Sequence, residues 1–527
     1  MASQPVLING TWKPARESSS FHASNPKTKE QLSDAYPVST WEDCDEALSA
    51  AVEAARAMRK IPSEAIANFL EVFANKIEEN KDALVEMANT ETALPVSPRL
   101  ADGELPRTTG QLRQAAAAAR EGSWRNITID TANDIRACYS PIGPVCVFGP
   151  NNFPFAFGSV SGGDFAAAIA AGNPVIGKAN SSHPGTTRLF GEIALQAIEE
   201  TNMPPATVQL LYRTSHADGE RLVSDPRNGA TGYTGSRSAG LKLKAAADAA
   251  GKPIYLELSS VNPVVILPGA LKERSAQIAE EFQTSGLMGT GQFCTNPGIS
   301  LFVAGTETDA FIGDVTKRYA EAPVGTLLSE SVQNSMCANV QHLIDSGAKS
   351  LVGQGKAADN GFSCENTLLQ VSAKQFIANS AALQEEAFGN CAMFIVADSI
   401  AELVAAIDCM EGNLTGCVYS DTNGSDDDDY TLVADRLRPL VGRLLNDKMP
   451  TGVAVSPAMN HGGPYPATGH PGFTAVGIPG SIHRFAMLEC YDGVRPDRLP
   501  SCLQNENPNK QTWRLIDGSW TQDNVSS

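Results

Sequence analysis

The sequence predicts an α/β fold with two domains that each contain a parallel β-sheet, and a small β arm outside both. Three observations lead to this prediction. Short β-rich runs alternate with amphipathic or Ala-rich segments from residue 144 onward, a pattern typical of βαβ units. A second series of the same kind begins at residue 262. Two extended segments, 126–140 and 484–492, fit neither series.

The first domain is expected to begin with helices. Apolar residues recur at helical spacing in 42–58 and again in 66–77, which predicts two amphipathic helices. The first alternating series follows and ends with the predicted strand PIYLEL. We therefore assign residues 1–125 and 141–258 to the first domain and residues 259–483 to the second.

The two extended segments are expected to form the arm. The run NITIDTANDIRACYS, within 126–140, alternates in polarity, and its expected partner is RFAMLECYD, within 484–500. Because an unprotected sheet edge promotes association, we expect these strands to bridge copies of the chain in a homodimer or homotetramer. Residues 501–527 form a polar C-terminal extension.

Composition excludes several classes of function. The formal net charge of -19 over 527 residues argues against binding to nucleic acid or to anionic membranes, which requires a basic surface. Neither a signal-peptide pattern nor a window of roughly 18 apolar residues is present, so a cytoplasmic location is expected. The eleven cysteines include no CxxC and no Cys/His cluster at zinc spacing, so we expect no metal site.

One cysteine has neighbours that suit reaction better than packing. Cys294 lies in GTGQFCTNPG, residues 289–298, between a predicted helix and a predicted strand. A cysteine that packs in a core usually has apolar neighbours, whereas these glycines and the proline predict an irregular turn. The alternative is a cysteine that merely occupies a loop.

Two other residues supply chemistry that a cysteine nucleophile needs. Glu257 ends a predicted strand in PIYLELSSVNP, and a carboxylate flanked by leucines suits a general base. Asn152 in FGPNNFPF offers a neutral amide donor, which suits an oxyanion. The alternatives are a structural carboxylate and a turn residue.

Six motifs in order make the chain resemble the aldehyde dehydrogenase superfamily over nearly its whole length: NNFPF, GNPVIGKANSS, YTGSRSAG, LELSS, GQFCT and EEAFG. The resemblance implies two Rossmann-like domains, the first for the cofactor and the second for catalysis, plus an oligomerisation arm. It also implies that Cys294 attacks an aldehyde to give a thiohemiacetal and then a thioester. Asn152 would hold the oxyanion, and Glu257 would activate water to release a carboxylic acid.

The resemblance implies a nicotinamide dinucleotide cofactor. NAD-preferring members usually carry a glutamate three positions after the lysine of GNPVIGK, where this chain has Ser181. A serine does not repel a 2′-phosphate, so we expect NADP to be preferred and NAD to be used as an alternative. The alternative is a loss of selectivity. The cofactor site is assigned to Lys178, Ser181, His216 (with Arg213 nearby), Gly235, Ser236, Gly240, Glu386 and Phe388.

Within the superfamily the chain is most similar to 2,5-dioxopentanoate (α-ketoglutarate semialdehyde) dehydrogenases and to NADP-dependent fatty aldehyde dehydrogenases of luminous bacteria. The stretches that carry this similarity are SGGDFAAAIAAGNPVIGK, GQFCTNPG, HGGPYPATGH and ENPNKQTWRLIDG. A semialdehyde with a carboxylate tail calls for arginine in the substrate funnel. The expected substrate residues are Arg107, Arg113, Phe153, Phe155, Phe293 and His470.

Other functions stay open at this point. A fatty aldehyde would prefer an apolar funnel, in which case both arginines are ordinary surface residues. An acylating dehydrogenase would pass the thioester to coenzyme A, although Glu257 favours water as the acceptor. A binding protein without catalysis is also possible for a scaffold of this kind, but Cys294, Glu257 and Asn152 are all present.

Overall fold

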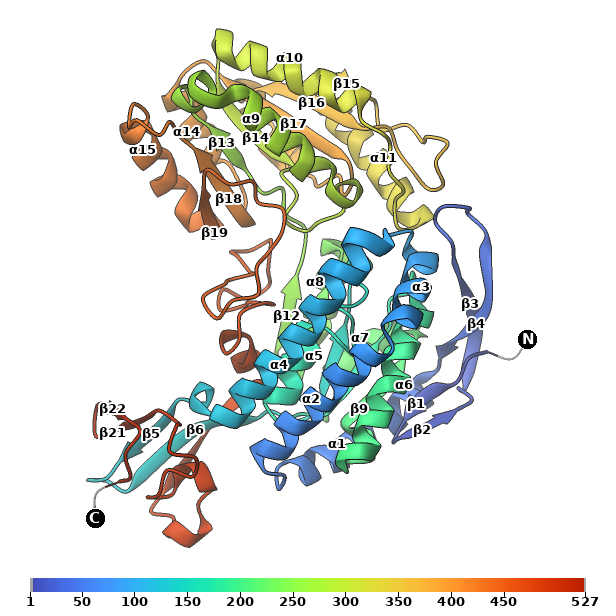
Figure 1. The fold of residues 1–527 in the computed structure, drawn as a ribbon, viewed down its shortest axis with the longest axis vertical. Coiled ribbons are helices and arrows are strands. Elements are labelled where there is room, and N and C mark those ends of the chain that lie inside the picture. Colours follow the sequence, from blue (N-terminus) through green and yellow to red (C-terminus); the bar gives the residue numbers. More distant parts are fainter. Residues whose placement is uncertain (1–2, 526–527) are drawn as a thin grey trace.

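The structure is a computed structural model that describes residues 3–525. It contains two large seven-stranded sheets, a three-stranded sheet and a five-stranded sheet. Figure 1 shows the two large sheets in separate lobes, and the small sheet with β5, β6, β21 and β22 projecting from one lobe. The strands of the first large sheet come from residues 6–257 and those of the second from residues 264–446. The two alternating series in the sequence therefore form two different sheets.

The first large sheet has the strand order β12-β11-β7-β8-β9-β1-β2. Its central strands run parallel and are buried on both faces, as in β7 and β9, which explains their apolar runs. These strands are β7 (Val145–Phe148), β8 (Val175–Lys178), β9 (Val208–Leu211), β11 (Ala230–Thr234) and β12 (Ile254–Glu257). The helices of this part are α1 (Trp41–Met58), α2 (Ser63–Glu79), α3 (Lys81–Thr92), α4 (Leu105–Glu121), α5 (Gly163–Ala170), α6 (Pro184–Thr201), α7 (His216–Ser224) and α8 (Arg237–Ala249).

The chain begins with strands, so the prediction that helices come first is wrong. β1 (Val6–Ile8) and β2 (Thr11–Lys13) form a hairpin around Asn9 and Gly10, whose φ angles are 51° and 71°. Asn-Gly is a favoured pair for such a two-residue turn. β3 (Glu17–Ser24) and β4 (Gln31–Ser39) pair with each other, and β10 (Arg213–Thr214) joins β4. β3 is mostly exposed, so its sequence lacks the apolar alternation that reveals a half-buried strand.

The second large sheet has the order β15-β16-β17-β14-β13-β18-β19 and is parallel except for β15. Its strands are β13 (Val264–Ile266), β14 (Ile299–Val303), β15 (Lys349–Val352), β16 (Thr367–Ser372), β17 (Cys391–Ala397), β18 (Asn413–Tyr419) and β19 (Val441–Asn446). Its helices are α9 (Pro268–Leu287), α10 (Thr306–Glu321), α11 (Glu330–Asp345), α12 (Ala373–Ala378), α13 (Ser380–Leu383), α14 (Ile400–Asp408) and α15 (Asp427–Leu437). Within residues 3–525, none of the helices combines the length and apolarity that a bilayer crossing requires.

The small sheet confirms the predicted pairing of distant segments. β6 (Ile135–Pro141) runs antiparallel to β20 (Ala486–Asp492) and also pairs with β5 (Ile127–Asp130). The C-terminal extension adds β21 (Arg514–Ile516), parallel to β5, and β22 (Ser519–Thr521). Arg514 is fully buried and donates to the carbonyl oxygens of Gln504 (2.8 Å) and Asp523 (2.6 Å). The extension is therefore an integral part of this sheet.

Candidate active site

The loop between α9 and β14 holds Cys294 in a fixed position. Residues 289–291 all have positive φ (55°, 59° and 69°), a region that favours glycine. A Cβ on Gly291 would lie 2.0 Å from the carbonyl oxygen of Gly389, so no other residue fits there. The side-chain amide of Asn262 donates to the carbonyl oxygen of Cys294 at 2.9 Å. The thiol is therefore presented by a loop with little freedom to move.

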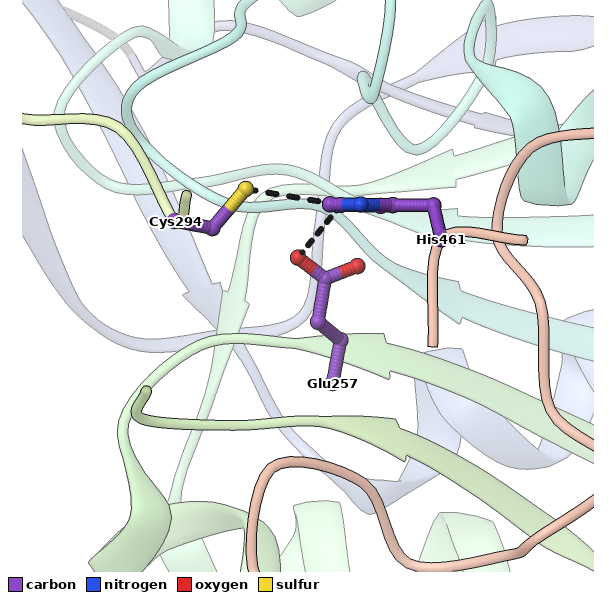
Figure 2. Close-up of side chains that lie close together, drawn as sticks. All are labelled: Glu257, Cys294 and His461. Carbon is purple, nitrogen blue, oxygen red and sulfur yellow. Dashed lines mark hydrogen bonds and ion pairs between the residues drawn. The ribbon is translucent and has the colours of Figure 1, made fainter. Parts of the chain in front are cut away.

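Cys294 forms a close group with Glu257 and His461 (Figure 2). The Nε2 atom of His461 lies 3.4 Å from Cys294 Sγ and 3.0 Å from Glu257 Oε1. Glu257 stands at the end of β12, and both Glu257 and His461 are almost fully buried. The backbone N–H of His461 donates to Thr474 Oγ1 at 2.9 Å, and the ring packs against Phe157. Two potential proton acceptors, His461 and Glu257, therefore lie close to the thiol.

The surroundings of Cys294 disfavour a resting thiolate. Burial, and then the negative charge of Glu257, raise the pKa of this thiol well above its ordinary value. The positive charge of Arg107 opposes the shift but is a smaller effect. Because only a thiolate is strongly nucleophilic, an attack by this sulfur would require the proton to leave at the same time. Glu257 and His461 are the groups within reach to accept it.

Two cavities reach Cys294 from different directions. The larger, of about 630 Å³, runs from the thiol along the first turns of α8 and α11. Burial raises the pKa of Glu386 in its wall to about 7, although Ser259 and Ser260 donate to that carboxylate. The expected residues that border this cavity are Asn152, Gly235, Ser236, Glu257, Cys294, Glu386 and Phe388.

The start of α8 forms one wall of the large cavity. Ser236 is the N-cap of this helix, and its hydroxyl accepts from the backbone N–H of Ala239 at 3.5 Å. Gly240 lies one turn later and does not border the cavity. A Cβ there would be 2.5 Å from Leu258 Cδ2 and 2.9 Å from the ring of Tyr233. Gly240 therefore allows α8 to pack close to β12, an indirect role.

Three other expected cofactor residues do not border the large cavity. Lys178 ends β8, and Ser181 lies in the turn that follows. Burial, and then the like charge of Arg213, lower the pKa of Lys178 to about 8. His216 begins α7 and is exposed. These side chains gather at the carboxyl ends of β8 and β9, where open parallel sheets bind ligands.

The smaller cavity, of about 230 Å³, reaches the thiol between α4 and the second lobe. Arg107 contributes its guanidinium group to the wall of this cavity. The Nη1 atom of Arg107 donates a hydrogen bond to the carbonyl oxygen of Val453 at 2.8 Å. The Nε and Nη2 atoms of Arg107 are buried without a hydrogen-bond partner. Since buried donors are normally paired, these two nitrogen atoms have hydrogen-bonding capacity that the protein itself does not use. The cavity is also lined by Arg99, Glu104, Phe153, Phe157, Phe293, Thr295, Val453 and His461.

Arg113 and Phe155 were expected in the substrate funnel, and the structure contradicts both. Arg113 faces α2, where its Nη1 and Nη2 atoms lie 2.6 Å and 2.8 Å from the two carboxylate oxygens of Glu78. Phe155 is fully buried and packs against Phe190, with 5.4 Å between ring centroids. Neither side chain borders either of the two cavities.

His470 is also not where it was expected. It is exposed, its Nδ1 atom accepts from the backbone N–H of Gly472 at 3.0 Å, and its ring packs against Tyr255. The histidine that reaches the thiol is His461, the first residue of the same stretch HGGPYPATGH. The motif pointed to the right loop, but the sequence could not show which of its two ends turns inward.

Arg99 is a site residue that sequence reasoning missed. Its Nη2 atom donates to the carbonyl oxygen of Asn152 at 2.8 Å, and its Nη1 atom lies 3.3 Å from Glu104 Oε2. Its guanidinium carbon lies 4.0 Å from the ring centre of Phe153 and 5.1 Å from that of Phe293. Arg99 therefore supports the loop that carries Asn152. Nothing in the surrounding sequence VSPRLADGE distinguishes it from a surface arginine.

Comparison with known proteins places this geometry in a family. Residues 12–445 match the aldehyde dehydrogenase family. The chain is 38% identical over 518 residues to alpha-ketoglutaric semialdehyde dehydrogenase 2 of Azospirillum brasilense, covering 95% of this chain and 97% of that protein. It is 34% identical over 494 residues to alpha-ketoglutaric semialdehyde dehydrogenase of Acinetobacter baylyi, covering 92% of each.

The fold is also similar to solved structures of aldehyde dehydrogenases. The crystal structure of betaine aldehyde dehydrogenase from Staphylococcus aureus in complex with NAD+ superposes with a TM-score of 0.80. It is 20% identical in sequence, and the match covers 93% of this chain and 94% of that one. The chain belongs to the aldehyde dehydrogenase family and is an NAD(P)-dependent oxidoreductase that acts on aldehydes.

Proposed function

We propose that the protein oxidises 2,5-dioxopentanoate, or a similar small aldehyde with a carboxylate tail, to the corresponding dicarboxylic acid. The observation that carries this proposal is the pair of unpartnered nitrogen atoms on Arg107, a residue that lines the same cavity as Cys294. A guanidinium group binds carboxylates through paired hydrogen bonds. The names of the Azospirillum and Acinetobacter relatives support the same class of substrate.

The dimensions of the smaller cavity favour a short substrate. Its volume is about 230 Å³, and Phe153, Phe157 and Phe293 form its apolar walls. A short semialdehyde with its carbonyl carbon at the thiol would direct its carboxylate toward Arg107, which lines the same cavity. A long aliphatic aldehyde would leave the buried donors of Arg107 unpaired, which costs binding energy.

The side chains around Cys294 divide the chemistry between them. The amide nitrogen of Asn152 donates one hydrogen to the carbonyl oxygen of Gln292 at 3.0 Å and keeps the other for the oxyanion formed by sulfur attack. The bound nicotinamide supplies the acceptor for the hydride. Glu257 then takes a proton from the water that attacks the thioester. This position of Glu257 favours hydrolysis over transfer to coenzyme A.

NADP is the proposed preferred cofactor. The large cavity has the volume and the polar wall for a dinucleotide, with Glu386 and Ser236 placed for ribose and phosphate groups. Ser181 stands after β8 with a hydroxyl in place of a carboxylate, and Lys178 and Arg213 add positive charge nearby. A 2′-phosphate would relieve the mutual repulsion of these two cations.

The test is a comparison of kcat/Km for 2,5-dioxopentanoate, pentanal and tetradecanal, each with NADP and with NAD. We expect the highest value for the semialdehyde with NADP. A higher value for tetradecanal would favour the fatty aldehyde alternative, and a higher value with NAD would contradict the cofactor preference. Product analysis with and without coenzyme A separates hydrolysis from acyl transfer.

We also propose that the chain assembles at least as a homodimer through β20. This strand is the outer strand of the small sheet, and its Met487 and Leu488 side chains are 45% and 60% exposed. Pairing with the same strand of a second copy would satisfy the free edge. Light scattering should give a dimer or tetramer, and Leu488→Lys should shift the mass toward the monomer. A monomeric wild-type protein would contradict the proposal.

A further inference from the structure

The three groups around the thiol have the chemistry of a transition-metal site. A cysteine sulfur, a histidine nitrogen and a carboxylate oxygen lie within 4.8 Å of one another in Cys294, His461 and Glu257. Among the residues that the structure describes, no other three histidine, cysteine, aspartate or glutamate side chains bring their ligand atoms this close together. The three residues are far apart in the sequence, so local spacing could not reveal them.

The ligand atoms lie at separations close to those of a tetrahedral zinc site, all within 4.8 Å of one another. With bond lengths of about 2.3 Å to sulfur and 2.0–2.1 Å to nitrogen and oxygen, tetrahedral angles separate the ligand atoms by about 3.3–3.6 Å. The separations here are 3.4 Å between Cys294 Sγ and His461 Nε2 and 3.0 Å between His461 Nε2 and Glu257 Oε1. Small rotations of the side chains would make room for the ion.

A second observation points to a ligand at this place. The Oε2 atom of Glu257 is buried without a hydrogen-bond partner, in a residue that is 1% exposed. Figure 2 shows this carboxylate turned toward the histidine and the thiol. A buried carboxylate oxygen without a donor is costly, and a cation that both oxygens of this carboxylate contact would satisfy it. Both cavities are bordered by Cys294, so a water molecule could enter as a fourth ligand.

We propose that Cys294, His461 and Glu257 bind one Zn²⁺ ion, which blocks the nucleophile reversibly and competes with the aldehyde. On binding, the thiol releases its proton to solvent and the sulfur forms a bond to zinc as the thiolate. Thiolate and imidazole ligands select zinc or cobalt over the harder magnesium and calcium ions. The proposal rests on Cys294 being the nucleophile of the proposed function.

The test uses the full chain, freed of metal with a chelator and titrated with Co²⁺ under anaerobic conditions. We expect one equivalent to produce a near-ultraviolet thiolate-to-cobalt charge-transfer band that Zn²⁺ abolishes. The band should vanish in Cys294→Ser. Zinc affinity is measured by competition with a chromophoric chelator. It should fall at least about tenfold in His461→Asn and in Glu257→Gln, because losing even a residue that only supports a metal ligand usually costs that much.

Matched controls use residues of the same kinds elsewhere in the chain. Cys490 is an exposed cysteine and His470 is the exposed histidine of the same loop, so Cys490→Ser and His470→Asn should leave the cobalt spectrum and the zinc affinity unchanged. NADP binding shows that each variant is folded. A band that survives in Cys294→Ser, or wild-type zinc affinity in His461→Asn, would overturn the proposal.

Because the cobalt spectrum needs no turnover, its outcome is independent of the aldehyde assay. In that assay, Zn²⁺ should raise the apparent Km for the aldehyde, and a chelator should restore it. A protein that oxidises the semialdehyde but shows no band would refute the metal site alone. A protein that shows the band without oxidising any aldehyde would refute the proposed function alone.

Discussion

Replacing Arg107 by methionine separates the binding of a carboxylate tail from the chemistry at the thiol. Methionine keeps an apolar stem near the rings of Phe153 and Phe157, which the guanidinium group approaches to 5.9 Å and 5.4 Å. The substitution removes the buried Nε and Nη2 atoms that have no partner. In the proposed function a semialdehyde carboxylate pairs with these donors, whereas an aldehyde without a charged tail does not need them.

The size of the effect follows from the environment of Arg107. Removing one member of a buried, hydrogen-bonded charge pair costs about 2–5 kcal/mol. The bond from Nη1 to Val453 holds the guanidinium group in place before substrate arrives, so a middle value of about 3 kcal/mol is appropriate. At about 1.36 kcal/mol per factor of ten, kcat/Km for 2,5-dioxopentanoate should fall about 160-fold. The value for pentanal should change little.

The assay is steady-state formation of NADPH with each aldehyde, and the matched control is Arg113→Met. Arg113 lies six positions later on α4, and its ion pair with Glu78 is exposed. Such a pair contributes about 0–1 kcal/mol to stability, so this variant should keep wild-type kinetics with both aldehydes. Thermal unfolding of both variants checks that they are folded.

Two results would refute the reasoning about Arg107. An equal loss with 2,5-dioxopentanoate and pentanal would mean that Arg107 supports the loop or the thiol instead of the tail. No loss with either substrate would mean that the carboxylate binds elsewhere. Arg99→Met gives a useful contrast: Arg99 supports the backbone of Asn152, so its loss should lower kcat for both aldehydes.

Three further predictions concern other residues. Since burial lowers the pKa of Lys178 to about 8, its ammonium is present below that pH and lost above it; the Kd for NADP in fluorescence titrations should rise by up to about tenfold per pH unit above 8, and Lys178→Met should show a flat profile. The raised pKa of Cys294 predicts slow alkylation by iodoacetamide at neutral pH, with a rate that still rises near about pH 9. Peptide mass spectrometry measures this rate, and a rate that stops rising below about pH 7 would contradict the prediction. In chemical unfolding, Gly240→Ala should destabilise the protein by about 1–3 kcal/mol, because its Cβ would meet Leu258 at 2.5 Å. Gly110→Ala, in a helix with nothing within 4 Å, should stabilise it by about 0.5–1 kcal/mol; a loss of stability there would contradict the packing argument.

Much of the fold could be predicted because burial is written into the order of apolar residues. β7 and β8 lie inside a parallel sheet with both faces covered, so nearly every residue in them is apolar. The short or exposed strands β1 to β4 lack such a pattern, so they could not be predicted in this way. Asn9-Gly10 was the one local clue to the first hairpin, because both residues adopt positive φ.

The proposed catalytic residues could be named from the sequence because each stands in a motif whose local structure suits its chemistry. Cys294 lies in a glycine-rich turn, and Glu257 ends a strand. Which neighbours join them was decided by tertiary structure. Residues 107 and 113 are six positions apart on one helix, so about 120° separates their directions and only one can face the cavity. His461 and His470 lie in one loop without regular structure, and its packing against Phe157 and Thr474 turns His461 to the thiol. Side-chain direction outside regular elements depends on contacts distant in the sequence, and these exist only once the chain has folded.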